Sequence, residues 1–481
     1  MNTTRSIVRG SVYSGGSVLV SMAAMLVVGK IFTNALDKTG VAVFALLLIW
    51  SDFFILAGNC GLAMCLPKLI AGAPAERRAR VSGSAVVFQA AVGVVTGAAV
   101  LVIWGFFPGT IARVLGNDGG LLAPYLWLLP PLFFVGGLRD TALAALAGFN
   151  RYAQRAAGII TAAVAQAALV FIFVWMMRGG VAVLTWTFAA AYALETVWLF
   201  IALPRGARWQ ADLRTAAESV RFSLALYVNT LLTFLFQRFD TVLVVLITRN
   251  VEAVALFEIA KRLATMLSRV LGAMLVPYLP SVSDLIARRD TEGAARLLRV
   301  AGAAATFFGY MGVLAAVTVQ EQLIVALFNA DYLGATVVLG LLMTVTCIAV
   351  QTGLMGQTLI ALGRPGIVTL VNIATAALSV GANFLLLPRM GIQGAAVAAL
   401  VAGAVSNAAQ TFFVRRAGLR VSIPRHLAPH LFMAVAAGIM LLGGGAFPWR
   451  VAGAAVFVTL CFVFRLITPA QLRNALPAWK G

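Results

Sequence analysis

Long apolar stretches alternate with short polar ones along the chain, and fourteen of the apolar stretches have about the length of a membrane-spanning helix. Such a helix needs about 20 mainly apolar residues. The longest polar connections, near 204–221, 283–299 and 415–430, are too short to fold as soluble domains. The pattern predicts an all-α, polytopic membrane protein with 14 transmembrane helices, at 8–29, 40–64, 82–107, 121–148, 156–177, 181–203, 222–247, 251–280, 300–318, 333–362, 367–387, 391–414, 431–446 and 451–467.

Lys and Arg are distributed unequally between alternate connections. With the N-terminus placed in the cytoplasm, the cytoplasmic segments, with Arg139 counted among them, hold 25 of these residues, the outer connections hold 7, and the other four lie within helices. Because cytoplasmic loops carry an excess of Lys and Arg, we expect a multi-pass protein with both ends in the cytoplasm. The first apolar run, from Ser11, is longer than the apolar region of a signal peptide and is interpreted as the first membrane helix.

The composition supports this interpretation: 62% of the residues are hydrophobic, 11% are charged, and the formal net charge is +20. In a soluble domain such a charge would suggest a nucleic-acid partner. Here the basic residues are scattered over short loops, so we expect membrane lipids and not nucleic acid as partners.

No motif indicates catalysis or metal binding. The four cysteines lie in apolar segments without zinc or redox spacing, and we interpret them as buried apolar residues. His426 and His430 are four apart in a basic polar connection, where we favour an interfacial loop helix over a metal pair. The chain lacks a phosphate-cradling Gly-rich loop with Lys and a His-Glu-x-x-His motif. We therefore expect no cofactor, no metal and no enzymatic activity.

Two parts of the sequence resemble each other. Val41-Ala-Val-Phe44 opens the second predicted helix, and Val254-Ala-Leu-Phe257 opens the eighth, 213 residues later. Leu143-Ala-Ala-Leu146 and Leu359-Ile-Ala-Leu362 match at an offset of 216. Helices 1–6 and 7–12 are therefore predicted to be two copies of one unit, related by an axis along the membrane normal. This predicts an N-lobe (1–203), a cytoplasmic linker (204–221), a C-lobe (222–414), and a last region (415–481) with a cytoplasmic loop and two further helices.

The predicted helix at 251–280 is apolar but carries charges on one side. Glu258, Lys261, Arg262 and Arg269 follow spacings of three, four and seven, and so lie along one helical stripe. A basic side chain at the centre of a membrane helix costs about 2.5–3.5 kcal/mol on insertion scales. We therefore expect the three cations to face a wet cavity, a partner charge or an anionic cargo. A purely internal set of ion pairs and snorkelling of the cations to a membrane interface are the alternatives.

Further ionisable residues lie within predicted helices, and such residues are functional candidates although they often pair with each other. Arg238 and Asp240 are two residues apart and point to different faces of a helix, so we expect separate partners for them. The full set outside the helix at 251–280 is Asp52, Arg139, Asp140, Glu195, Arg238 and Asp240.

The repeat suggests a gate between the two lobes. An offset of 213 maps Asp52 onto Thr265, which lies inside the cationic stripe. We hypothesise that Asp52 pairs with Lys261, Arg262 or Arg269 across a central cleft, and that an anionic head group breaks the pair.

The second lobe also carries uncharged polar side chains within its helices. Hydrogen bonding between helices is the interpretation we favour for them, and contact with sugar hydroxyls is the alternative. They are Gln351, Gln357, Asn372, Asn383, Asn407 and Gln410.

Several sequence segments resemble polysaccharide flippases of the Wzx type, which are members of the multidrug/oligosaccharidyl-lipid/polysaccharide (MOP) exporter superfamily. The resemblance covers nearly the whole chain through diffuse motifs. They are Gly40-Val-Ala-Val-Phe-Ala45, Gly61-Leu-Ala-Met-Cys-Leu-Pro67, Phe239-Asp240, Ala255-Leu-Phe-Glu-Ile-Ala-Lys-Arg262, Pro277-Tyr-Leu-Pro280, Ala361-Leu-Gly-Arg364 and Leu387-Pro-Arg-Met-Gly-Ile-Gln-Gly-Ala-Ala396.

The resemblance implies two six-helix lobes around a central cavity and transport by alternating access. The implied cargo is an oligosaccharide linked to undecaprenyl pyrophosphate, moved from the cytoplasmic to the periplasmic leaflet of a bacterial inner membrane for lipopolysaccharide or exopolysaccharide synthesis. Polymerase and chain-length proteins of the same pathway are expected partners. In family members with 14 helices the last pair can help accommodate the lipid tail, and the sequence leaves this role of the last two helices open.

Specific residues can be placed in this scheme. Pyrophosphate is an anion that Arg can meet with a planar set of donors, so we predict a substrate site at Arg238, Lys261, Arg262 and Arg269. Coupling to an ion gradient or to the membrane potential, or gating, is assigned to Asp52, Glu195, Asp240 and Glu258.

Other functions remain open at this point. A multidrug exporter of the same superfamily would need an acidic cavity for cationic drugs, which the cationic stripe disfavours. A flippase for the lipid-linked peptidoglycan precursor shares the count of 14 helices. A membrane glycan polymerase or ligase would need a substantial outer loop with acid, base or Arg residues, and the sequence has none.

Overall fold

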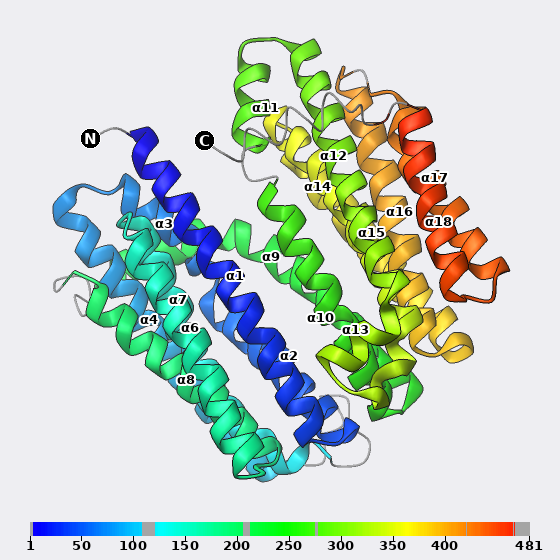
Figure 1. Cartoon of the computed structure of the whole chain (residues 1–481). Coiled ribbons are helices and arrows are strands. Elements are labelled where there is room, and N and C mark those ends of the chain that lie inside the picture. Colours follow the sequence, from blue (N-terminus) through cyan, green and yellow to red (C-terminus); the bar gives the residue numbers. More distant parts are fainter. Residues whose placement is uncertain are drawn as a thin grey trace. The chain divides into compact units, whose positions relative to one another are not determined.

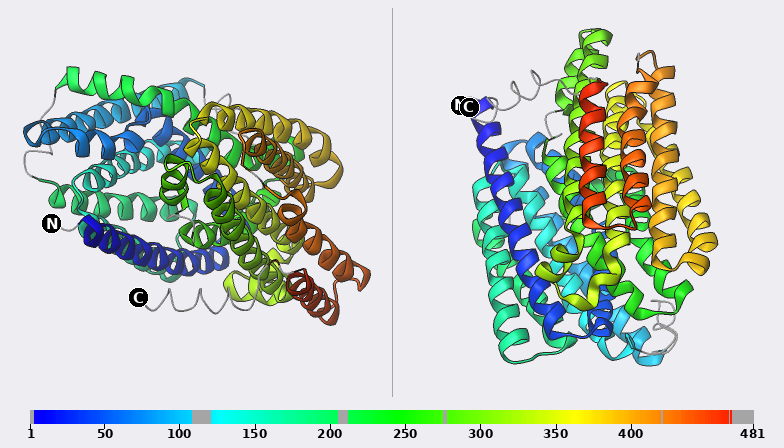
Figure 2. Two further views of the ribbon diagram at one scale, coloured as in Figure 1. Left: turned by 90° about the horizontal axis from the view of Figure 1, so that it is seen from above. Right: turned by 45° about the vertical axis from the view of Figure 1, so that its right-hand side comes forward.

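The computed structural model of the chain describes residues 3–107, 121–204, 212–274, 278–419, 421–464 and 466. The described residues form helices and contain no strand, so the predicted all-α polytopic class is confirmed. The chain divides into two compact units, residues 1–255 with 327–329 and residues 256–326 with 330–481. We call them the first bundle and the second bundle. Figures 1 and 2 follow the chain through both, from blue to red.

Helices of the first bundle pack mainly around α6, which contacts α2, α3, α4 and α8, while α7 contacts α1 and α8. α9 packs against α3 and α4. The elements are α1 (Thr3–Ala35), α2 (Lys38–Asn59), α3 (Leu62–Gly72), α4 (Ala75–Phe106), η1 (Ala123–Leu128), α6 (Leu129–Gly148), α7 (Tyr152–Leu169), η2 (Val170–Met176), α8 (Val181–Ala202) and α9 (Leu213–Thr248).

In the second bundle α14 packs against α12 and α16, and α15 packs against α16. The last two helices pair with each other and contact α12. The elements are α10 (Val251–Met274), whose first five residues belong to the first bundle, α11 (Tyr278–Ala287), α12 (Thr291–Thr318), α13 (Gln320–Leu327), η4 (Ala330–Ala335), α14 (Thr336–Ala361), α15 (Pro365–Met390), α16 (Ile392–Arg416), α17 (Ile423–Leu442) and α18 (Phe447–Val463).

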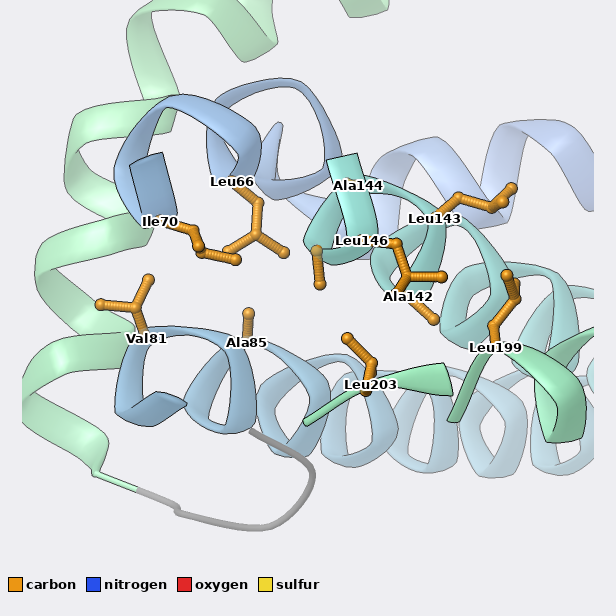
Figure 3. Packing of buried hydrophobic residues seen from close by; sticks show 11 residues of the cluster. Leu66, Ile70, Val81, Ala85, Ala142, Leu143, Ala144, Leu146, Leu199 and Leu203 are labelled. Carbon is orange, nitrogen blue, oxygen red and sulfur yellow. The ribbon is translucent and has the colours of Figure 1, made fainter. Parts of the chain in front are cut away.

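Each bundle has a cluster of buried apolar side chains of its own. In the first bundle α3, α4, α6 and α8 bring Leu66, Val81, Leu146 and Leu199 together with Ile70 (Figure 3). In the second bundle the corresponding cluster comes from α11, α12, α14 and α16. Lipid offers these side chains as apolar a surrounding as the core does, so close packing and interhelical hydrogen bonds hold the helices together.

The predicted repeat is visible in the helix ends. α1 ends at Ala35 and α9 at Thr248, and α2 begins at Lys38 and α10 at Val251, each pair 213 residues apart. The residues before α2 and α10 also match. Asp37 Oδ1 accepts a hydrogen bond from the Gly40 N–H at 2.9 Å, and Asn250 Oδ1 accepts one from the Ala253 N–H at 3.2 Å. Both are N-caps that satisfy an otherwise free backbone donor.

The turn after α6 recurs after α14 at the same offset. Asn150 has φ 57° and Gly363 has φ 73°. The Arg151 N–H donates to the Leu146 carbonyl at 2.9 Å, and the Arg364 N–H donates to the Leu359 carbonyl at 2.9 Å. The structure thus equates Leu146 with Leu359, and the offset of 216 predicted from the Leu-Ala tetrapeptides is wrong by three residues. Apolar residues recur every three or four positions in a helix, so a sequence match can slip by one turn.

The boundary between the two compact units falls within α10, whereas the predicted boundary between the two lobes falls before α9. α9 is the first helix of the second repeat by position, but it packs against α3 and α4. Compactness and membership of a repeat are different properties. The predicted lobe boundaries and the central cavity therefore stay predictions.

The second predicted helix, at 40–64, is broken in the structure. α2 ends at Asn59, Cys60 and Gly61 have φ 49° and 78°, and α3 begins at Leu62. The Asn59 Oδ1 accepts from the Ala63 N–H at 2.6 Å and so covers a backbone donor at the break. A Cβ on Gly61 would lie 3.0 Å from both the Ser223 carbonyl and the Tyr227 Cβ of α9. Glycine allows both the positive φ and this close approach.

Each of the fourteen predicted segments overlaps a helix, but some of these helices are too short or too polar to be recognised as membrane spans by length and composition. Ten of the described helices are long and apolar enough to cross a membrane. The other predicted spans correspond to α6, α9, α10 and α18. Arg139 and Asp140 lower the mean hydropathy of α6, several charges lie in α9 and α10, and α18 has 17 residues. The number of 14 spans therefore depends on helices that carry the charges of interest.

Candidate functional site

Two residues predicted for the site meet in the first bundle. Asp52 lies on α2 and Arg238 on α9, and the Arg238 Nη2 is 3.4 Å from the Asp52 Oδ2. Their side chains are 42% and 38% exposed, respectively. The pair is therefore accessible from outside the bundle while it joins two of its helices.

A second ion pair links α6 to α8. The Arg139 Nε donates to the Glu195 Oε2, and the Arg139 Nη1 is 3.1 Å from the Asp140 Oδ1. The Glu195 side chain is fully buried. Its other oxygen, Oε1, has no hydrogen-bond partner among the described residues. A buried carboxylate needs compensation for the loss of water, and Arg139 supplies it on one side only.

Tyr192 connects the two ion pairs. The Arg139 guanidinium lies 4.9 Å from the centre of the Tyr192 ring, within the range of a cation–π contact. Tyr192 is also within electrostatic range of Asp52 on α2. Arg155 on α7 is within electrostatic range of Asp140. The result is one charged cluster in the first bundle, which we call the charged cluster: Asp52, Arg139, Asp140, Arg155, Tyr192, Glu195 and Arg238.

The charged cluster is formally neutral, with three carboxylates and three arginines. Ion pairs in a low-dielectric surrounding are strong but replace an expensive loss of hydration. Sequence reasoning placed Asp52, Glu195 and Arg238 in the site. It identified Arg139 and Asp140 as intramembrane charges without a role, and it missed Arg155 and Tyr192 because no local pattern connects α7 and α8 to α6.

The cationic stripe lies on the less buried side of α10. Glu258, Lys261 and Arg262 are partly buried, and Arg269 is exposed. The opposite face is buried through Ile259, Ala260, Leu263 and Ala264. The Lys261 Nζ lies 5.6 Å from the centre of the Phe257 ring, and the Thr265 hydroxyl donates to the Lys261 carbonyl at 2.8 Å. The stripe is therefore available for contacts outside the buried core of its own bundle.

The predicted separate contacts of Arg238 and Asp240 are confirmed. Arg238 pairs with Asp52, while the Asp240 Oδ1 accepts a hydrogen bond from the Thr241 N–H at 2.8 Å. The hypothesised gate would join Asp52 to the stripe on α10, which belongs to the second bundle. That pairing stays a prediction.

The second bundle contains a polar network that the sequence did not predict. α17 begins at Ile423 rather than near 431, so His426 and His430 lie in the first two turns of a helix long enough to span a membrane. Their rings are hydrogen-bonded to Tyr310, Gln351, Asn407 and Thr411. The predicted start of this helix near 431 is therefore wrong, and both histidines lie inside the helix and not in the connection before it. The spacing of four and the Pro at 424 are signals for a helix start that could have found them.

The uncharged polar residues of the second bundle differ among themselves. Gln351 and Asn407 bond to each other across α14 and α16, as expected for interhelical contacts. Three other amide oxygens are buried without a hydrogen-bond partner among the described residues: those of Gln357, Asn383 and Gln410. The described residues include no group of three or more His, Cys, Asp or Glu side chains that could hold a metal ion.

A family model for polysaccharide biosynthesis proteins matches residues 43–337, which is more than half of the chain. The chain belongs to this family. The matched range contains Asp52, Glu195 and Arg238, and the whole cationic stripe on α10. No curated protein matches the chain by sequence.

Solved structures of flippases and transporters share the fold. The lipid II flippase MurJ in an inward closed conformation matches with a TM-score of 0.74 at 13% identity, over 95% of this chain and 98% of that one. An inward-facing multidrug resistance MATE family transporter of the MOP superfamily matches with a TM-score of 0.67 at 14% identity, over 84% and 96% of the two chains. A MOP superfamily transporter from Pyrococcus furiosus, whose binding pocket is described as having reverse polarity, gives 0.58 at 13% identity, over 86% and 96%.

At these identities the likeness concerns the fold. The family match confirms the predicted relation to polysaccharide synthesis, and the solved structures show that the chain shares the fold of MOP superfamily transporters.

Proposed function

We propose that this protein flips oligosaccharide repeat units linked to undecaprenyl pyrophosphate from the cytoplasmic to the periplasmic leaflet of a bacterial inner membrane, by alternating access. The observation that carries the proposal is the cationic stripe on α10. It places Lys261, Arg262 and Arg269 outside the buried core of an otherwise apolar helix, in a chain of the polysaccharide biosynthesis family. Cations at membrane depth meet the charge that hydrocarbon rejects on a pyrophosphate.

The direction and surroundings of transport follow from the same proposal. Both ends of the chain lie in the cytoplasm, consistent with the excess of Lys and Arg in alternate connections. The polymerase and chain-length proteins that act on the flipped repeat units are its expected partners. The flipped units then enter a surface polysaccharide such as lipopolysaccharide or an exopolysaccharide.

Coupling is assigned to the charged cluster. Asp52 and Glu195 belong to one set of interacting groups linked through Tyr192 and Arg139. Neutralising one carboxylate by a proton or a cation would change which arginine holds which partner. Such an exchange gives α2, α6, α8 and α9 two arrangements, as alternating access requires. Asp240 and Glu258 are the further candidates for coupling or gating.

The test is a genetic replacement in the native cell. The double variant Lys261→Ala/Arg262→Ala should accumulate lipid-linked repeat units and lose surface glycan at a normal level of protein in the membrane. The matched control is Arg296→Ala/Arg299→Ala, which removes two exposed cations from α12 of the same bundle and should leave surface glycan unchanged. Wild-type glycan in the first variant would contradict the site.

A lipid II flippase is the second candidate, because MurJ matches nearly the whole chain with a TM-score of 0.74. Deletion of the gene separates the two functions. Loss of surface glycan with intact cell walls supports the polysaccharide substrate, whereas accumulation of lipid II and cell lysis supports the alternative. A multidrug exporter is less favoured because its cationic drugs would meet the three cations of α10, and a polymerase or ligase is less favoured because the outer connections are short.

A further inference from the structure

Four helices of the second bundle meet at the two histidines of α17, which are the only histidines of the chain. Tyr310 comes from α12, Gln351 from α14, and Asn407 and Thr411 come from α16. His426 is 9% exposed and Tyr310 is 1% exposed. Placing two imidazoles inside a helix of membrane length is costly unless their polar atoms are satisfied.

The hydrogen bonds form a continuous chain. The His430 Nδ1 is 2.5 Å from the Tyr310 hydroxyl, and the His430 Nε2 is 2.5 Å from the Gln351 Oε1. The Asn407 Nδ2 donates to the same Gln351 Oε1 at 3.2 Å. The His426 Nε2 is 2.9 Å from the Asn407 Oδ1 and 3.0 Å from the Thr411 hydroxyl. The chain therefore runs from Tyr310 to Thr411 through both rings.

The acceptors define where the ring hydrogens lie. An amide oxygen only accepts, so the Nε2 of each histidine carries a hydrogen and donates it. In a neutral ring the Nδ1 of His430 is then an acceptor, and the Tyr310 hydroxyl donates to it. Both histidines are neutral in this arrangement, and His430 has one basic nitrogen that faces a hydroxyl group.

Burial among uncharged partners disfavours a positive charge on either ring, and it opposes two charges most strongly. Every hydrogen-bond partner of the two rings among the described residues is uncharged. Among the described residues, Cys347 of α14 is within electrostatic range of Tyr310, and the exposed Arg425 lies on α17 itself, one residue before His426. The ring centres of His426 and His430 are 6.5 Å apart, a distance at which two imidazolium ions would repel strongly in a low-dielectric interior.

We propose that His426 and His430 form a site that binds a single proton inside the second bundle. A proton on the Nδ1 of His430 leaves both of its hydrogen bonds in place. The Nε2–H still donates to Gln351, and the new Nδ1–H donates to the Tyr310 oxygen once the tyrosine hydroxyl turns its hydrogen away. A second proton on His426 is excluded by the charge already present. The site lies in the first two turns of α17, close to one end of the helix, where water can deliver the proton.

This site is independent of the charged cluster and of the cargo. It holds α17, which lies outside the predicted repeat, to three helices within it. A proton here places a positive charge at that junction, so the attachment of the last two helices would respond to pH.

The test uses the full chain in lipid nanodiscs with ¹⁵N-labelled histidine, because only two residues then give imidazole signals. At high pH both rings should show the neutral tautomer with hydrogen on Nε2. As the pH falls, one ring should become imidazolium while the other stays neutral to the lowest pH at which the protein remains folded, as followed by circular dichroism. Independent titration of both rings, or of neither in the folded protein, would overturn the proposal.

Variants identify the groups that hold the proton. Tyr310→Phe removes the acceptor for the Nδ1–H and should weaken proton binding about tenfold, since a hydrogen bond to a charged group is the stronger kind. The matched control is Tyr278→Phe, a buried tyrosine of the same bundle whose hydroxyl bonds to Thr358 at 2.6 Å, and it should leave the titration unchanged. In His430→Gln the remaining His426 should accept the proton less readily, because its Nδ1 has no hydrogen-bond acceptor among the described residues to stabilise the added hydrogen. An unchanged titration in Tyr310→Phe would contradict the assignment of the proton to His430.

Discussion

Two equivalent pairs of helices are held together differently in the two bundles. Charged groups join α6 to α8 in the first bundle, and neutral groups join α14 to α16 in the second. α6 and α8 are connected by the ion pair of Arg139 with Glu195. At an offset of 213 the position of Arg139 is Thr352 on α14, and Asn407 of α16 lies one residue before the equivalent of Glu195. The Asn407 amide donates to the Thr352 hydroxyl at 3.2 Å.

The difference shows that the repeat conserves a contact but not its chemistry. A neutral amide and hydroxyl can hold two helices together, so the charges of the first bundle are not needed for packing alone. Charged groups at membrane depth are expensive. Their presence in one copy and absence from the equivalent positions in the other supports a role in coupling, as proposed above.

The largest expected effect on stability comes from removing Glu195 while its ion-pair partner Arg139 remains. Glu195→Ala leaves the partly buried Arg139 without its closest partner and should lower the free energy of unfolding by about 3–5 kcal/mol. The double variant Arg139→Met/Glu195→Met should recover most of this loss, because an apolar pair carries no uncompensated charge. Thermal unfolding in lipid nanodiscs measures both. A double variant as unstable as Glu195→Ala would show that the pair contributes through shape rather than through charge.

A smaller effect is expected at the break between α2 and α3, which also distinguishes the two copies. Gly61→Ala places a Cβ at φ 78° against α9 and should destabilise the protein by about 1–3 kcal/mol. The equivalent position in the second copy is Met274, so the second copy does not use a glycine there. Gly272→Ala in α10 is the control. Its Cβ would meet nothing within 4 Å, and the substitution should be neutral or slightly stabilising in the same unfolding measurement.

The smallest effect is expected for the neutral contact in the second bundle. Thr352→Val should cost about 1 kcal/mol, since single hydrogen bonds between membrane helices average about 0.6 kcal/mol. A double-mutant cycle with Asn407→Leu isolates the contact from the other hydrogen bonds of Asn407 and should give a coupling energy well below that of Arg139 with Glu195. Equal coupling energies in the two bundles would remove the contrast on which the comparison depends.

Much of the fold could be predicted from the pattern of apolar residues. Each of the fourteen predicted segments overlaps a helix, and the offset of 213 reappears in the helix caps and turns of the structure. Helix length and composition are local properties, and the requirement that backbone groups be satisfied within lipid leaves helices as the solution for such segments. The break after Asn59 was missed because no proline or charge marks it.

The site was predicted only in part. The cationic stripe on α10 follows from spacing within a single helix, and the structure places it on the less buried side. The partner of Asp52 within its bundle, Arg238, lies 186 residues away, and the network around His426 and His430 draws on four helices. Such contacts depend on how helices pack, which spacing in one segment does not reveal.

The sequence by itself determined that this is a helical membrane protein, that it contains a repeated unit, and that unusual charges lie within its helices. These conclusions rest on lipid being a poor solvent for polar groups, which acts on each segment separately. Only the tertiary structure decided which charges neutralise one another and that the two histidines are enclosed by neutral partners. Electrostatic compensation falls off over a few ångströms, so it depends on distances between residues that the chain keeps far apart.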